Sequence, residues 1–147
     1  MNRLTTNPFG GFTLIALIII LAVISVVLMG AQSWYANHTI RTKIAEALST
    51  ADSAKTAITI TCTEDPSIAA LNNNLVGYNL PTSLYAKSVT LSGSCTSPII
   101  TVLTINTGLI IDPTLTITGG NSVENALWSW TCASDGLDIH VPNTCHT

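Results

Sequence analysis

The sequence contains few charged residues and few aromatic ones, and it lacks the motifs of several classes of protein. Only 9% of its residues are charged, against roughly 25% in an ordinary soluble domain. The net charge of −3 argues against a nucleic-acid-binding surface carried by the single subunit. No HExxH, GxSxG or phosphate-binding loop occurs, and no CxxC pair indicates a zinc or redox site. The sequence therefore gives little support to an enzyme.

Asp135, Asp138 and His140 form the group that most resembles a metal site. On a surface loop, residues of this kind are more often solvated turn residues than ligands. The other two histidines are His38, far away in the sequence, and His146, next to the last residue. We therefore expect no catalytic residue, no metal and no cofactor.

Charge is missing above all from the first third of the chain. Nothing ionised lies between Arg3 and Arg41, apart from His38 when it carries a proton. Residues 12–29 form an apolar run of 18 residues that only two hydroxyl side chains interrupt. A run of this length and composition predicts a membrane-spanning helix rather than the core helix of a small domain.

A secretory signal ending near residues 28–31 is the alternative to a retained anchor. The apolar run is too long for a typical signal core, and its end lacks a clean A-x-A cleavage site. Ahead of the run stands a short polar leader, residues 1–11, and the run begins abruptly at a Gly-Gly-Phe step. The pattern therefore favours an anchor behind a leader that is removed.

The helix should continue beyond the apolar run, from Thr13 to about Thr61. Apolar residues recur there at helical spacing and form one stripe able to cover a sheet, with the Lys55 stem as its one polar interruption. The stripe consists of Ile40, Ile44, Ala47, Leu48, Ala51, Lys55 and Ile58. Asp65-Pro66 then ends the helical pattern.

The remainder of the chain predicts a connecting loop and four short strands. Residues 62–86 are expected to form the loop, with one helical turn around residues 68–71. Alternation of apolar and polar residues predicts strands at 87–92, 99–105, 114–118 and 126–132. Their inward-facing residues are expected to be Val89, Leu91, Ile100, Val102, Leu115, Ile117, Leu127 or Trp128, and Trp130. The expected fold is α+β, with a long N-terminal helix packed on a four-stranded antiparallel sheet.

Four widely spaced cysteines indicate two disulfides. Cys62, Cys95, Cys132 and Cys145 follow a membrane-targeting segment, which suggests an oxidising compartment. Four cysteines allow three connectivities, and free buried thiols are the alternative. The positive charges on the two sides of the apolar run do not settle its orientation, but the cysteines favour an N-terminus inside the cell and a C-terminal domain outside it.

Three stretches of the sequence resemble type IV pilins. Residues 11–16, Gly-Phe-Thr-Leu-Ile-Ala, are similar to the prepilin cleavage site, where a leader ending in glycine precedes Phe-Thr-Leu-Ile-Glu and an apolar helix. Residues 35–48 and 53–58 resemble the helix of a type IVa major pilin. Trp130-Thr131-Cys132 and residues 141–145 resemble the terminal disulfide loop of the family. The resemblance covers residues 10–61 and 126–145.

This resemblance implies a division of the chain into three parts. Residues 1–11 would be a leader, residues 12–61 the transmembrane and filament-core helix, and residues 62–147 the globular head. It further implies cleavage between Gly11 and Phe12 by a prepilin peptidase, followed by N-methylation of Phe12. The alternative is an uncleaved anchor. The assembly helix would begin with Leu14, Ile15, Ala16 and Leu17. The resemblance also implies a Cys132–Cys145 bond, which leaves Cys62–Cys95 as the second pair.

The resemblance implies a structural subunit of a type IV pilus. Such a subunit resides in the bacterial inner membrane before assembly and in the extracellular pilus afterwards. Its partners would be other pilin subunits, identical or different, the prepilin peptidase, and the assembly machinery in the inner membrane. The filament would serve adhesion, twitching motility or DNA uptake, and it could contact a host surface, DNA or phage.

Ala16 is the main departure from the family pattern. The family has a glutamate here, which is thought to pair with the terminal amine of a neighbouring subunit, and alanine has no charge for that pairing. This favours a minor or tip pilin or a type II secretion pseudopilin, whereas residues 35–58 resemble a major pilin. A membrane-anchored binding domain that never polymerises is a further alternative.

Overall fold

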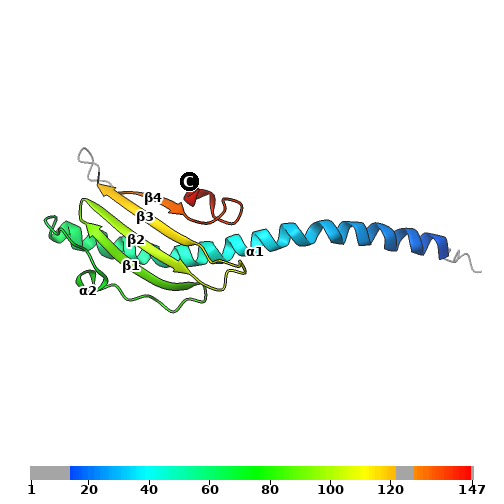
Figure 1. The fold of residues 1–147 in the computed structure, drawn as a ribbon, viewed down its shortest axis with the longest axis horizontal. Helices are drawn as coiled ribbons and strands as arrows, with labels where there is room; N and C mark the ends of the chain where they lie inside the picture. Colours follow the sequence, from blue (N-terminus) through cyan, green and yellow to red (C-terminus); the bar gives the residue numbers. More distant parts are fainter. Residues whose placement is uncertain (1–13, 122–127, 147) are drawn as a thin grey trace, which may run out of the picture. The chain divides into compact units, whose positions relative to one another are not determined.

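The structure is a computed structural model that describes residues 14–121 and 128–146, without the side chains of residues 30–33 and 121. The chain divides into two compact units, residues 1–36 and residues 37–147. The elements, drawn in Figure 1, are α1 (Leu14–Glu64), α2 (Asn73–Val76), β1 (Ala86–Ser94), β2 (Ser97–Thr104), β3 (Thr114–Asn121), β4 (Trp128–Ser134) and the 3₁₀ turn η1 (Asn143–Cys145).

The long helix is confirmed, and it ends directly before the Asp65-Pro66 step that was expected to stop it. α1 continues to Glu64, three residues beyond the expected Thr61. The amide of Asp65 still donates to the Thr61 carbonyl at 3.0 Å. Pro66 has no amide proton to extend this ladder. The Asp65 carboxylate instead accepts from the Ser67 amide (3.0 Å) and hydroxyl (2.6 Å), which fixes a turn away from the helix.

The predicted stripe on α1 forms the helical side of the core. Ile44, Ala47, Ala51 and Ile58 are fully buried, and Ile40 and Leu48 are partly buried against the same cluster. Two details differ from the prediction. Ala54 is also fully buried and completes the stripe. Lys55 lies at its margin, half-buried, and its Nζ contacts the Asp52 carboxylate at 2.9 Å.

The four predicted strands form one antiparallel sheet in the order β1-β2-β3-β4. Its register aligns the predicted inward residues in two rows, Val89–Val102–Leu115 and Leu91–Ile100–Ile117, and none of these six is more than 4% exposed. The observed strand ends lie within three residues of the predicted ones, apart from the start of the fourth strand. Together with the buried face of α1 these rows make one hydrophobic core, which confirms the α+β fold.

The fourth strand, β4, carries two tryptophans on the core side of the sheet. Trp128 and Trp130 are partly buried and stacked, with ring centroids 5.7 Å apart. Gly119 pairs with Trp130, and a Cβ at Gly119 would lie 2.6 Å from the indole ring. The absence of a side chain at Gly119 therefore allows the indole to pack over β3. Of the two candidates for the first inward position, Trp128 fills it, and Leu127 lies outside the described residues, as does the predicted start of this strand.

The helical turn expected around residues 68–71 is wrong. Ile68 and Leu71 instead bond to the β1–β2 turn, through Cys95 N to Ile68 O (3.0 Å) and Leu71 N to Gly93 O (2.8 Å). The helical turn forms further along the chain, as α2, because the Asn72 side chain accepts a hydrogen bond from the Leu75 amide and caps the N-terminus of α2. Gly77, at φ 67°, ends it in the left-handed conformation.

Candidate functional site

The N-terminal part of α1 presents an uncharged apolar surface. Side chains 14–29 are exposed, apart from the half-exposed Ala16. Among the described residues, α1 contains a segment long and apolar enough to cross a membrane. The Ser25 hydroxyl donates to the Leu21 carbonyl at 2.7 Å, so the polar group within this segment is satisfied inside the helix. A surface of this kind requires lipid or apolar protein around it.

The predicted site residues at the N-terminus fall in two groups. Gly11 and Phe12 lie outside the described residues. The first described turn of α1 consists of Leu14, Ile15, Ala16 and Leu17. At position 16 the family pattern has a glutamate, and this chain has the methyl group of an alanine instead. This turn therefore offers apolar contacts and no side-chain charge.

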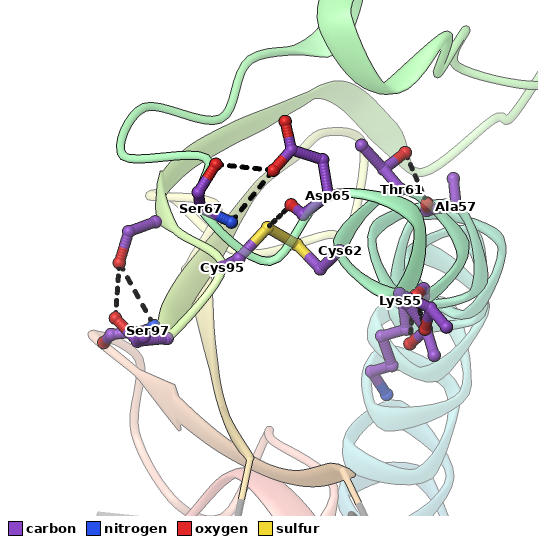
Figure 2. Close-up of a disulfide and its surroundings, with 12 residues drawn as sticks. Lys55, Ala57, Thr61, Cys62, Asp65, Ser67, Cys95 and Ser97 are labelled. Carbon is purple, nitrogen blue, oxygen red and sulfur yellow. Dashed lines mark hydrogen bonds between the residues drawn. A yellow bond between two sulfur atoms is a disulfide. The ribbon is translucent and has the colours of Figure 1, made fainter.

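One disulfide joins the end of the helix to the sheet. Cys62, in the last turn of α1, bonds to Cys95 in the β1–β2 turn, with their Cα atoms 5.4 Å apart (Figure 2). Both cysteines are buried. Figure 2 also shows the Asp65–Ser67 turn beside this bond, and hydrogen bonds from Ser67 lower the pKa of the Asp65 carboxyl. The bond fixes the C-terminal end of α1 at the hairpin end of the sheet.

A second disulfide, Cys132–Cys145, closes the C-terminal loop. Cys132–Cys145 is the pairing that the resemblance implies, and Cys62–Cys95 is the pair that this leaves. Inside the loop, Val141 and Cys145 are fully buried, and backbone bonds join His140 to Leu137 (2.9 Å) and Cys145 to Pro142 (2.9 Å). The loop is thus a structured element with its own core contacts.

The side chains of Arg41 and Asp135 attach this C-terminal loop to α1 and β3. The Arg41 guanidinium donates to the carbonyls of Asp138 (3.4 Å) and Ile139 (3.2 Å). The Asp135 carboxylate accepts from the Thr114 amide at 2.6 Å. Asp135, which the sequence placed in a metal-like group, therefore serves as a backbone acceptor that holds the loop against β3.

A third group of contacts organises the β2–β3 loop. The Asp112 carboxylate accepts from the amides of Asn106 (3.2 Å) and Thr107 (3.0 Å) and from the buried Thr107 hydroxyl. Lys43 donates to the Asn106 carbonyl at 3.4 Å and lies 5.5 Å from the Tyr85 ring centroid. The Thr107 hydroxyl is the main cause of the lowered pKa of Asp112, and Lys43 adds to it.

Acid should loosen the β2–β3 loop through Asp112. Its pKa is lower in the folded chain than the ordinary 3.8, so its stabilisation is present above that pH and is lost as the pH falls below it. Asp112→Asn should therefore make the free energy of unfolding depend less on pH below about 3.8. Denaturant unfolding of detergent-solubilised chain across this range measures the effect. Thr107→Val, which removes the main hydrogen bond, should weaken the pH dependence likewise, and an unchanged pH dependence in both variants would contradict the assignment.

Comparison with known proteins identifies relatives of this chain. The sequence model of a family described as Pilin (bacterial filament) matches residues 40–146. The chain is also 27% identical over 139 residues to the Fimbrial protein EcpC of Eikenella corrodens, an alignment that covers 92% of this chain and 89% of that protein. The family match spans the buried part of α1, the whole sheet and the disulfide-bonded loop.

Proposed function

The chain belongs to the pilin family of bacterial filament proteins, and on that basis we propose that it is a type IV pilus subunit that polymerises through the N-terminal part of α1. The observation that carries the proposal is the exposed, uncharged surface of residues 14–29. The unit of residues 37–147 has its own core and two disulfides, so its folding does not depend on covering that surface.

One apolar helix can serve in two environments. In the inner membrane, lipid chains surround it, and after extraction, copies of the same helix can surround it in a filament core. Both environments favour the same aliphatic side chains, so no change of sequence is needed between them. At ~25 cal/mol per Å² of apolar area kept from water, such a segment contributes tens of kcal/mol, part of which the membrane already provides.

Processing at Gly11-Phe12 precedes assembly in this proposal. A membrane prepilin peptidase removes residues 1–11, Phe12 is N-methylated, and the assembly machinery of the inner membrane moves the subunit into an extracellular pilus. The lack of a side chain on Gly11 lets a peptidase approach the peptide bond closely. The pilus would act in adhesion, twitching motility or DNA uptake.

Shearing of cells tests the proposal directly. Filaments released by shear, separated from membranes and probed with antibody against residues 37–147, should contain the chain. A membrane-anchored binding domain that does not polymerise would stay in the membrane fraction. Absence of the chain from sheared filaments, while it is abundant in membranes, would contradict the proposal.

Ala16 favours a second candidate, a minor or tip pilin or a secretion pseudopilin. A carboxylate in a membrane span costs about 2.5–3.5 kcal/mol, so a glutamate at this position requires a compensating partner such as a neighbouring terminal amine. In a subunit with Ala16 both the cost and the ion pair are absent. A subunit that is incorporated rarely, or at a filament end, can do without that pair.

Ala16→Glu should raise the share of the chain found in sheared filaments. The added carboxylate would pair with the terminal amine of a neighbouring subunit, whereas the neutral, similarly sized Ala16→Gln would not. The ratio of filament to membrane signal, compared between the two variants, measures the effect. Equal ratios in wild type, Ala16→Glu and Ala16→Gln would refute a role for charge at this position.

A further inference from the structure

Three segments meet at one end of the sheet. Because the strands are antiparallel and adjacent in sequence order, β1 and β3 begin where β2 and β4 end. Residues 82–85, 105–113 and 135–142 therefore lie at the same end, which we call the three-loop end. The β1–β2 turn with Cys95 lies at the opposite end.

Exposed apolar side chains gather at the three-loop end. They are Leu84, Ile110, Ile111, Leu137 and Ile139, all at least 55% exposed. Ile110 and Ile111 protrude most, at 104% and 82%. Between the second and third segments lies a largely apolar cavity of about 400 Å³, lined by Leu109, Ile110, Ile111, Pro113 and Leu137 together with Asp135, Gly136 and His140. Among the described residues of the head, the other large apolar side chains exposed to solvent, Ile60, Leu75 and Leu103, come from separate elements.

Four charged side chains near this surface are engaged within the head, whereas the carboxylate of Asp138, between Leu137 and Ile139, is exposed. Arg41 and Lys43 donate to backbone carbonyls of the second and third segments. The carboxylates of Asp112 and Asp135 accept from backbone amides. The attraction of this surface for a partner is therefore mainly apolar rather than ionic, and it should depend little on salt.

The contacts of Arg41 and Lys43 also establish that the chain enters the head at the three-loop end. From there α1 leads to Cys62, which is bonded to the opposite end. Directly before this entry, the sequence has Trp34 and Tyr35, a pair of the type enriched at membrane surfaces, and then the apolar residues 14–29. The exposed isoleucines are thus joined by a short stretch of chain to the segment assigned to the membrane.

We propose that the three-loop end binds the surface of the lipid bilayer while the subunit awaits assembly, with Ile110, Ile111 and Leu137 entering the interfacial layer. The inference rests on the proposed anchoring by residues 12–29. A short tether keeps a weakly binding surface at a high effective concentration near its partner. Protruding aliphatic side chains on loops are suited to the interface, where apolar area drives binding. Withdrawal of these loops then accompanies extraction into the filament.

A fluorescent probe in the full chain tests the proposal. Among the described cysteines none is free, so Ile111→Cys supplies the thiol for an environment-sensitive label. The labelled chain is reconstituted at low density in vesicles of phosphatidylethanolamine and phosphatidylglycerol that carry nitroxide-labelled lipid. Leu75→Cys, an exposed leucine on α2, provides the matched control. Quenching at position 111 should exceed that at position 75 by about twofold or more.

Further variants and controls separate the outcomes. Ile110→Ser in the labelled Ile111→Cys chain should reduce the quenching towards the control. Ile60→Ser, an exposed position of α1 near Cys62 and the opposite end of the sheet, should not. Equal quenching at positions 111 and 75, in chains that still float with the vesicles, overturns this inference and leaves the anchoring intact. Chains that fail to float overturn the anchoring as well. Shielding of position 111 that appears only at high protein density identifies a second copy as the occupant and also overturns the inference.

Discussion

Val23→Arg should leave the chain in the membrane but reduce its share in sheared pili by about tenfold or more, because a guanidinium without a partner is far costlier between packed helices than near lipid headgroups. Val23 lies in the middle of the exposed apolar surface. In a bilayer, the cost of about 2.5–3.5 kcal/mol is smaller than the gain from the remaining aliphatic residues, and the long side chain can extend towards the surface.

The control for this variant is Val23→Leu, which keeps an aliphatic side chain at the same position. It should match wild type in both the membrane and the sheared fraction. Quantitative immunoblots of the two fractions provide the measurement. Wild-type levels of Val23→Arg in filaments would show that this part of α1 is not in contact with other subunits.

Removal of the Cys62–Cys95 bond should destabilise the head by about 3–4 kcal/mol, and by more than removal of Cys132–Cys145. The first bond closes a segment with a sequence separation of 33 and the second one of 13, so the first restricts the unfolded chain more. In the chain-entropy account, the second should contribute about 3 kcal/mol. Cys62 and Cys95 are also both buried, so their loss removes core contacts as well.

The two double variants, Cys62→Ala with Cys95→Ala and Cys132→Ala with Cys145→Ala, serve as controls for each other. Guanidinium unfolding in detergent, followed by tryptophan fluorescence, gives the free energy of unfolding for each. In the second variant, Arg41 and Asp135 still hold the C-terminal loop to α1 and β3. A larger loss of unfolding free energy in the Cys132→Ala, Cys145→Ala variant would contradict the predicted order of the two disulfides. It would assign the stability of the head mainly to the C-terminal loop.

Local patterns were sufficient to predict most of the fold. The stripe from Ile40 to Ile58 and the alternation in the strands depend only on spacing along the chain. In the folded head, the residues that these patterns predict to face inward form the core. Ala54 was missed because helical spacing allows a step of three or four residues after Ala51, and the step of four leads to Lys55. The turn at α2 was displaced because three consecutive asparagines indicate a loop, whereas one of them, Asn72, caps a helical turn.

The loops at the entry of the head could not be predicted, because distant residues position them. Arg41 contacts carbonyls 97 and 98 residues away, and Lys43 one that lies 63 residues away. No local pattern encodes such contacts. From the sequence, the aspartates of the C-terminal loop were therefore interpreted as solvated turn residues, although the Asp135 carboxylate accepts a hydrogen bond from the Thr114 amide of β3. It likewise gave no sign that Ile110, Ile111 and Leu137 would share one surface.

Mass spectrometry of the N-terminus in sheared surface material shows whether the chain is both cleaved after Gly11 and assembled. We expect a chain that begins with N-methylated Phe12, recovered together with other subunits of the filament. That result would establish cleavage after Gly11 and assembly in the same sample. An intact Met1 on chains recovered only as single molecules from the membrane would contradict the account.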